Sequence, residues 1–544
     1  MKKRLLLLAL VVLSSLLMGC IPPAPKATRT PRASATPSTA PSPTATQPPV
    51  TSSAGFAFGV EYMLPGGLAA TYSQLGAKWA RSGTTKQFSW GTIEPKAPAS
   101  DGQHKYDWAD ADRIVAEWQK AGFQIQVYTN ANNTWASSTK LHHIPDPQYL
   151  DDFEEFVFQM VERYDGDGDR DMPGLKSPIL HYTVVEEWTG YFEGTAEDYL
   201  RILAAAHRAI KKANPEALVG LVDFFLVDVF DGSPSPEEIE RRAAKDHFLR
   251  HPMSEVRELL RHPDLFDIVE IHALGDYTEL YPTAEWLRAE MRKNGYDKPI
   301  WIGDSLAISS LIMAKGPRGL LPGAKDEDFY TIAPIRPQDA LRTIGWLEAF
   351  KDAKSPQHDA ALRWWRAFHA REVVKKVAVA IHAGYAGMNF AWLIESPLMQ
   401  LPRVTGSWGY QGLVDATFNF VTQTWKVAAP YPVFYTYQLA IAKLDGYSSV
   451  ERLDLGKDIY AYRFMVRGKP VYVLWREPGR LYFPDEQEPA PVQVKLPFDA
   501  ASALVTHILT ETGQSAPRTE TVAAESGQIA LSLGSEPVFV EAGQ

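Results

Sequence analysis

Short runs of apolar residues alternate along this chain with longer stretches in which apolar residues recur at helical spacing. The short runs, bounded by polar or turn residues, are typical of buried strands. The longer stretches, such as YLDDFEEFVFQMVERY from Tyr149 and AEDYLRILAAAHRAIKKAN from Ala196, are typical of amphipathic helices, and Asn214-Pro215 ends the second one. The predicted strands cover residues 56–61, 79–83, 124–128, 181–187, 217–223, 266–272, 299–304 and 387–392.

Eight strand-helix units within residues 55–430 predict an α/β fold, a (β/α)8 TIM barrel with parallel strands. The stretch from about 306 to 357 is longer than a strand-helix connection requires. It is rich in glycine and proline at its start. We therefore expect an insertion that lies above the carboxyl ends of the strands.

The character of the sequence changes after Trp425. YPVFYTYQLAIAKL predicts one more helix, and IYAYRFMVRGKPVYVLW predicts two alternating strands joined through Arg467-Gly468. Short strands and turns follow to the end of the chain. Residues 431–544 therefore predict a small C-terminal β-sandwich domain.

The first 20 residues have the order of an export signal: a basic head, an apolar stretch from Leu5 to Leu17, and small residues before Cys20. Leu17-Met18-Gly19-Cys20 resembles the bacterial lipobox, in which the cysteine is acylated, and Cys20 is the only cysteine of the chain. We expect an exported lipoprotein, anchored in the cell membrane or at the cell surface through several acyl chains on Cys20. The alternative is an ordinary cleaved signal with an incidental cysteine.

Residues 21–54 are almost entirely proline, threonine, serine and alanine. Such a composition cannot bury a core, so we expect a disordered tether that reaches on the order of 100 Å when stretched. The folded part would then stand away from the bilayer.

Composition and charge narrow the choice of partners. At 544 residues, 45% of them hydrophobic, the chain is long enough for a large core. Its net charge is -10 and it has no long basic cluster beyond the signal head, which argues against nucleic acid as a partner. A neutral or cationic ligand fits better, and no protein partner is identifiable from the sequence.

The predicted strands end in residues that carry chemistry. Reacting groups of a (β/α)8 enzyme lie at the carboxyl ends of its strands. The candidates there are Arg81, Glu186, Glu187, His272, Asp304 and Trp392. Two acids on separate strands, one to donate a proton and one to attack or to recruit water, are typical of glycoside hydrolysis. Tryptophans supply flat apolar faces for sugar rings.

Several stretches resemble the clan of retaining (β/α)8 glycoside hydrolases, most of all its β-xylosidase and α-L-iduronidase family. They are GAKWARSGTTKQFSWGTIEP, LHYTVVEEWTG, FDIVEIHALG, YDKPIWIGDS and GMNFAW. The resemblance runs from Gly55 to the end of the chain. It implies that Glu187 is the acid/base, that Arg81, His272 and the residue at position 186 bind substrate in the active site, and that Trp392 is a platform for a sugar ring.

Two positions depart from that family. Glu186 stands where the asparagine before the acid/base is normal, and Asp304 replaces the nucleophilic glutamate. Asp304 is one methylene shorter, and retention needs the two carboxyl groups about 5 to 5.5 Å apart. Asp304 is thus open to three roles: direct attack, activation of a water in an inverting reaction, or sugar binding without cleavage. The sequence predicts a hydrolase of β-linked glycans, and its alternative is a glycan-binding lipoprotein built on a former hydrolase.

Other aromatic residues divide between core and pocket. Trp90 and Trp135 each lie in a loop after an early strand, so we expect them, and Tyr277, to contact the substrate. Trp364 and Trp365 lie within a helical stretch, so we expect them to pack against the barrel.

One acidic loop resembles the start of a calcium site. In YDGDGDRDMPG, Asp165, Asp167 and Asp169 stand at alternate positions, but Arg170 stands where an EF-hand needs glycine and Lys176 where it needs glutamate. A solvated acidic loop is the alternative to calcium binding. We expect no other metal or cofactor.

Overall fold

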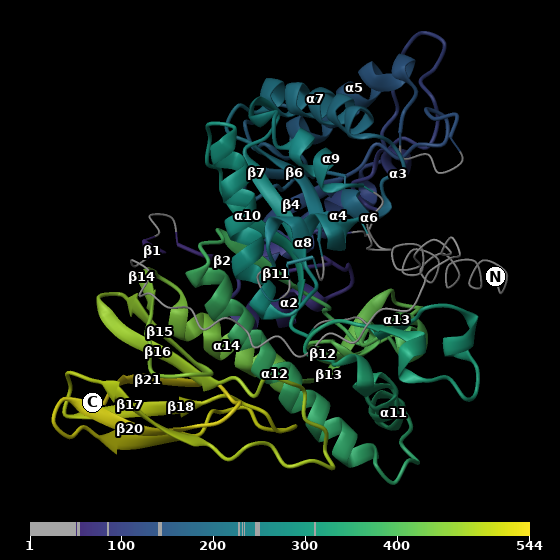
Figure 1. The fold of residues 1–544 in the computed structure, drawn as a ribbon. Coiled ribbons are helices and arrows are strands. Elements are labelled where there is room, and N and C mark those ends of the chain that lie inside the picture. Colours follow the sequence, from purple (N-terminus) through teal and green to yellow (C-terminus); the bar gives the residue numbers. More distant parts are fainter. Residues whose placement is uncertain are drawn as a thin grey trace.

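The computed structural model describes residues 50–51, 55–83, 86–139, 144–185, 187–226, 229–230, 232, 234–244, 251–308 and 312–543. Within these residues the chain forms a closed parallel barrel and, towards the C-terminus, a set of antiparallel sheets (Figure 1). The predicted fold class is therefore confirmed. None of the helices in the described ranges is long and apolar enough to cross a membrane.

The barrel is built from eight parallel strands, each within or close to a predicted range. Around the barrel they are β2 (Ala57–Val60), β3 (Trp79–Arg81), β4 (Gln124–Thr129), β5 (His181–Val184), β6 (Leu218–Phe225), β7 (Ile268–Ala273), β8 (Ile300–Leu306) and β11 (Gly387–Ala391), which pairs again with β2. Both faces of these strands are covered, which is why their sequences are nearly continuous apolar runs.

Helices surround the barrel. The main ones are α2 (Leu68–Tyr72), α4 (Ala109–Lys120), α5 (Leu150–Tyr164), α7 (Ala196–Ala213), α9 (Met253–Leu259), α10 (Leu280–Lys293), α12 (His358–His382) and α14 (Pro432–Leu444). The other helices are α3 (Trp90–Ile93), α6 (Trp188–Tyr191), α8 (Pro236–Ala243), α11 (Ala340–Lys351) and α13 (Pro402–Thr405). Thr195 and Asp198 form a capping box that starts α7, and the helix stops before Asn214-Pro215 as predicted.

Helix α14 completes the barrel. Its residues Val433, Phe434 and Tyr437 belong to the barrel core, and the Tyr437 hydroxyl donates a hydrogen bond to the carbonyl of Gly59 at 3.0 Å. Helix α14 follows the boundary expected at residue 430 and contacts the barrel. The antiparallel sheet itself begins at Tyr447.

The segment after β8 contains β9 (Ile312–Ala314), β10 (Phe329–Thr331) and α11, and it has a core of its own. That core includes Trp364 and Trp365 from the first part of α12, whose indole nitrogens donate to the carbonyls of Tyr482 and Tyr410. The expectation that these tryptophans pack against the barrel is wrong, because α12 extends past the barrel and carries the insertion on its extension.

The C-terminal part is a sandwich of antiparallel strands. One sheet has the order β1-β14-β15-β16-β21-β18-β19, and β17 pairs with β20. The strands are β1 (Val50–Thr51), β14 (Tyr447–Arg452), β15 (Ile459–Val466), β16 (Lys469–Arg476), β17 (Val492–Pro497), β18 (Ser502–His507), β19 (Thr519–Ala523), β20 (Gln528–Leu533) and β21 (Val538–Ala542). A separate hairpin, β12 (Val414–Asn419) and β13 (Thr424–Pro430), follows β11.

Strand β1 comes from the segment expected to be a disordered tether. Val50 pairs with Val450 and Thr51 with Ser449, at the edge of the large sheet. For these two residues the prediction of disorder is wrong, since they add a strand to an open sheet edge.

Candidate active site

The run PIWIGDS ends in a bulge that re-aims its acid. Ile302 of β8 lies opposite Ile271 of β7, but the next pair is His272 with Asp304, so Gly303 is an extra residue. A bulge bends its strand and redirects the side chain that follows. A Cβ at Gly303 would lie 2.5 Å from Oδ1 of Asp223, so a side chain there would need this buried acid to move. Asp304 and His272 are thereby neighbours at the carboxyl ends of adjacent strands.

His272 connects two acids. Its Nδ1 lies 2.9 Å from Oε1 of Glu187, and its Nε2 lies 3.1 Å from Oδ2 of Asp223. Burial alone would lower the pKa of His272, but the carboxylates of Asp223 and Glu187 raise this pKa well above its ordinary value. The imidazole is therefore a buried cation that orients Glu187.

Glu187 lies where β5 gives way to α6, on a turn with unusual backbone. Its φ is 48° and that of Val185 is 67°, both in the left-handed region that a β-branched residue such as valine strongly disfavours. Strain of this kind persists only where the surroundings impose it, and it clusters at functional sites. The next residue, Trp188, is fully buried and stacks on His251 with ring centroids 3.8 Å apart. Glu186, the other predicted acid, lies outside the described residues.

Asp304 is a buried carboxyl whose two oxygens differ. Oδ2 accepts a hydrogen bond from the Tyr62 hydroxyl at 3.1 Å, whereas Oδ1 is buried and has no hydrogen-bond partner among the described residues. Burial raises the pKa of Asp304, although His272 and Arg81 oppose the rise. Asp304 is therefore a stronger base than an ordinary aspartate.

Arg81 lies beneath this site as the centre of a layer of buried acids. It is fully buried, donates to Oε1 of Glu61 at 2.6 Å and to Asp223, and its Nε is 3.9 Å from Oε2 of Glu270. Burial would raise the pKa of Asp223, but Arg81 and His272 lower it to about 2. Arg81, which was expected to bind substrate, is thus surrounded by carboxylates of the barrel interior.

Sequence reasoning missed four residues of this arrangement: Glu61, Tyr62, Asp223 and Glu270. Glu61 and Asp223 are the final residues of the predicted strands FAFGVE and ALVGLVD. Applying the strand-end rule to these two strands would have identified them. Glu270 lies inside a predicted strand and bonds to Thr183 at 2.5 Å and to His181 at 2.7 Å. No sequence pattern distinguishes it from an outward-facing acid.

Trp392 directly follows β11 and stacks on Tyr62. The two rings are 4.4 Å apart and nearly parallel, at 4°. One face of the expected sugar platform is therefore covered by Tyr62. Both rings belong to a small apolar cluster with residues of the insertion and of the loop after β11, namely Met313, Ile332 and Trp408.

Three predicted substrate contacts lie elsewhere. Trp90 is completely buried against Trp135, and its indole donates to Oε2 of Glu94 at 2.9 Å. Trp135 donates to the backbone carbonyl of the same residue. Tyr277 is buried, donates to Glu477 and lies edge-on to rings of β15 and β16. Trp90 and Trp135 pack the loops after early strands, and Tyr277 joins the barrel to the C-terminal sheet. Their contact with a sugar stays a prediction.

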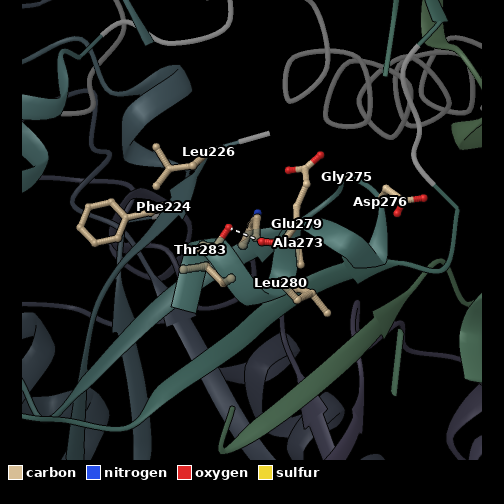
Figure 2. Close-up of a pocket in the computed structure, with 10 residues that line it drawn as sticks. Phe224, Leu226, Ala273, Gly275, Asp276, Glu279, Leu280 and Thr283 are labelled. Carbon is tan, nitrogen blue, oxygen red and sulfur yellow. Dashed lines mark hydrogen bonds between the residues drawn. The ribbon is translucent and has the colours of Figure 1, made fainter. Parts of the chain in front are cut away.

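A small cavity adjoins His272 on the side of β6 and α10, and Figure 2 shows the residues around it. Its volume of about 20 Å³ has room for roughly one water molecule and none for a sugar. It is lined by Phe224, Leu226, Ile271, His272, Ala273, Gly275, Asp276, Glu279, Leu280 and Thr283. Nearby, Nζ of the buried Lys376 donates to the carbonyls of Ala273, Gly275 and Leu306, which ties the end of β7 to the end of β8.

The acidic loop after α5 differs from the expected calcium ligands. Carboxylate oxygens of Asp165, Asp167 and Asp171 lie within 4.8 Å of one another, whereas Asp169 pairs with Arg170 at 3.2 Å. The carboxylate of Asp171 already accepts the backbone N–H groups of Gly166 and Gly168. Of the four acids at alternate positions in this loop, Asp165, Asp167 and Asp171 thus lie together and Asp169 does not join them.

No protein-family profile matches this sequence, and no curated protein is significantly similar to it. Solved structures do share its fold. A family 39 glycoside hydrolase from Bacteroides cellulosilyticus WH2 matches with a TM-score of 0.54 at 12% identity, over 90% of this chain and 81% of that one. A monomeric β-xylosidase from Caulobacter crescentus CB15 gives 0.51 at 13%, over 92% and 98%. A 4-O-α-L-rhamnosyl-β-D-glucuronidase from Fusarium oxysporum 12S gives 0.51 at 11%, over 91% and 99%. At these identities the likeness is one of fold.

Proposed function

We propose that this chain is a glycoside hydrolase that cleaves a β-linked oligo- or polysaccharide. The observation that carries the proposal is the arrangement at the ends of β5, β7 and β8. Glu187 is held by the His272 cation, and His272 pairs in register with the basic carboxyl of Asp304. Two carboxyl groups with different environments are what acid and base roles require.

In the proposed reaction Glu187 protonates the leaving oxygen and Asp304 supplies the base or the nucleophile. Glu187 suits the first role because its side chain is the more exposed of the two acids, at 15%, and is oriented by His272. Asp304 suits the second because burial makes it more basic. The fold shared with a β-xylosidase supports a β-linked substrate, but folds host many functions, so the argument rests on the site.

A panel of aryl glycosides tests this proposal. The protein should begin at Gln47, so that β1 is kept while the predicted signal and most of the tether are removed. We expect release of the phenol from at least one β-glycoside, with β-xylosides and β-glucosides tested first. A folded protein that releases no phenol across the panel but binds glycans would support the alternative, a glycan-binding protein.

We further propose that the hydrolase is exported and anchored to the bacterial cell membrane or surface through acylated Cys20. The lipobox-like Leu17–Cys20 and the proline-rich segment after it support this proposal. When the full chain is expressed in bacteria fed an alkyne-bearing fatty acid, we expect the label on the wild type and its loss in Cys20→Ser. Equal labelling of both would show that Cys20 is not the anchor.

A further inference from the structure

Asp304 is poorly placed to attack a substrate itself. Asp304 is only 4% exposed, its Oδ1 is buried, and its Oδ2 is covered by the hydroxyl of Tyr62. Tyr62 is the more exposed member of the pair. Among the described residues, the phenolic oxygen thus covers the one Asp304 oxygen that accepts a hydrogen bond, and a substrate on the side of Tyr62 would meet that phenol first.

Three independent features fix the position of this phenol. Its ring is stacked on Trp392 at 4.4 Å. The opposing loop approaches at Gly83, where a Cβ would come within 2.7 Å of the Tyr62 ring, so only glycine leaves the ring in place. The backbone of Tyr62 itself has a φ of 64°, in the left-handed region that bulky residues avoid. A side chain held this strictly is prepared for one geometry.

We propose that Tyr62 is the nucleophile of this site and that Asp304 is its base. This inference rests on the proposed glycosidase function. The aspartate is one methylene shorter than the glutamate of the family that the sequence resembles, and a phenol on its outer oxygen restores the reach that the shorter acid loses. Glycosidases with a tyrosine nucleophile are known among the sialidases. The raised pKa of Asp304 fits a carboxylate that takes a proton from a phenol.

In the first step the phenolic proton of Tyr62 passes to Oδ2 of Asp304 while its oxygen bonds to the anomeric carbon. The glycosidic bond breaks, and Glu187 gives its proton to the leaving oxygen. In the second step water attacks the anomeric carbon and loses a proton to the Glu187 carboxylate. The bond to Tyr62 breaks, and its oxygen takes the proton back from Asp304. Each step conserves protons and electron pairs, and the sugar is released with its configuration retained.

Covalent trapping tests the inference on the wild-type protein. The probes are the 2,4-dinitrophenyl 2-deoxy-2-fluoro β-xyloside and β-glucoside, which form slowly hydrolysed glycosyl-enzymes. From the protein that begins at Gln47, trypsin gives peptide 47–78, which holds Tyr62, and peptide 294–315, which holds Asp304. Fragmentation by mass spectrometry then identifies the residue, and we expect the sugar on Tyr62.

Sugar on Asp304 would overturn the inference and leave the proposed function intact. A second result would do the same: NMR of the first product shows hydrolysis with inversion, and no sugar is trapped on the protein. Silence across the aryl glycoside panel would remove the proposed function, and the inference with it.

A pair of variants gives a second measurement. Tyr62→Phe keeps the ring on Trp392 and removes only the hydroxyl, and we expect kcat to fall by at least about 1,000-fold. Tyr435→Phe is the matched control, since this half-buried tyrosine packs on Phe434 in α14. An active Tyr62→Phe enzyme, within about threefold of the control, would exclude the phenol as nucleophile.

Discussion

Replacing Glu187 with glutamine is expected to lower kcat on a glycoside with a poor leaving group by about 10²- to 10⁴-fold. An amide has the shape of the acid but no proton to give, and a positioned proton donor contributes about this factor. The hydrogen bond from His272 to Oε1 of Glu187 at 2.9 Å can pass to the amide oxygen, so the fold should be unchanged. Initial rates with a series of aryl glycosides measure the effect.

The leaving group separates loss of the acid from loss of the site. A dinitrophenolate departs without protonation, so we expect the Glu187→Gln enzyme to form the glycosyl-enzyme from a dinitrophenyl glycoside at nearly the wild-type rate. Glu197→Gln is the control, because Glu197 is an exposed residue in the first turn of α7. Equal losses for good and poor leaving groups would contradict the assignment of Glu187 as proton donor.

The buried acids around Arg81 share two cations, Arg81 and His272. Arg81 contacts Glu61 and Asp223 directly, and His272 adds a second positive charge between Asp223 and Glu187. Uncompensated carboxylates at this depth would be costly, so they occur only with such partners. Glu187 is thereby held through a chain of contacts that runs from His272 to Asp223 and on to Arg81 in the barrel interior.

The sequence predicted the parts of the site that depend on strand periodicity. Glu187, His272 and Asp304 were identified because each is the last residue of a predicted strand, and the barrel brings strand ends to one face. The pairing of Tyr62 with Trp392 was not accessible in this way. It depends on a left-handed turn after β2 and on the loop after β11, which are far apart in the chain and meet only when the barrel closes.

Trp90, Trp135 and Tyr277 show what the position of a residue after a strand leaves open. Each lies after a strand, but a position in a loop does not say which way a side chain points. Trp90 turns inward because Glu94 accepts its indole N–H and Trp135 covers it. The ring partners of Tyr277 are on β15 and β16, about 200 residues away, in a domain whose docking the sequence does not specify.

Replacing Asp304 with asparagine is expected to reduce kcat by about 10⁴-fold or more, the largest loss among these variants. An amide neither accepts the proton of Tyr62 nor attacks a sugar. Stability should not fall, because burial raises the pKa of Asp304, so at neutral pH ionising this carboxyl is harder in the folded than in the unfolded chain. The melting temperature at pH 7 should therefore equal or exceed that of the wild type. Asp110→Asn, an exposed change on α4, is the control.

The pH dependence of the wild type checks the same group. A carboxyl with a raised pKa loses its base form at a higher pH than an ordinary aspartate, so kcat/KM should fall on the acid side above the ordinary pKa of about 3.9. For the Asp304→Asn variant, retention of more than a tenth of the wild-type rate would show that Asp304 takes no part in the chemistry. If the wild type and Asp304→Asn are both inactive but bind glycans equally, the site binds sugars without cutting them.

Asp304→Glu distinguishes direct attack from attack through Tyr62. If the carboxylate attacks, restoring the missing methylene brings it closer to the sugar, and the rate should hold or rise. If Tyr62 attacks, the longer acid must displace the phenol whose oxygen now lies 3.1 Å from Oδ2, and the ring has no room to retreat between Trp392 and Gly83. A misplacement of about 1 Å costs on the order of 100-fold in rate. We therefore expect Asp304→Glu to lose activity, and the missing methylene is then a requirement of this site rather than a defect of it.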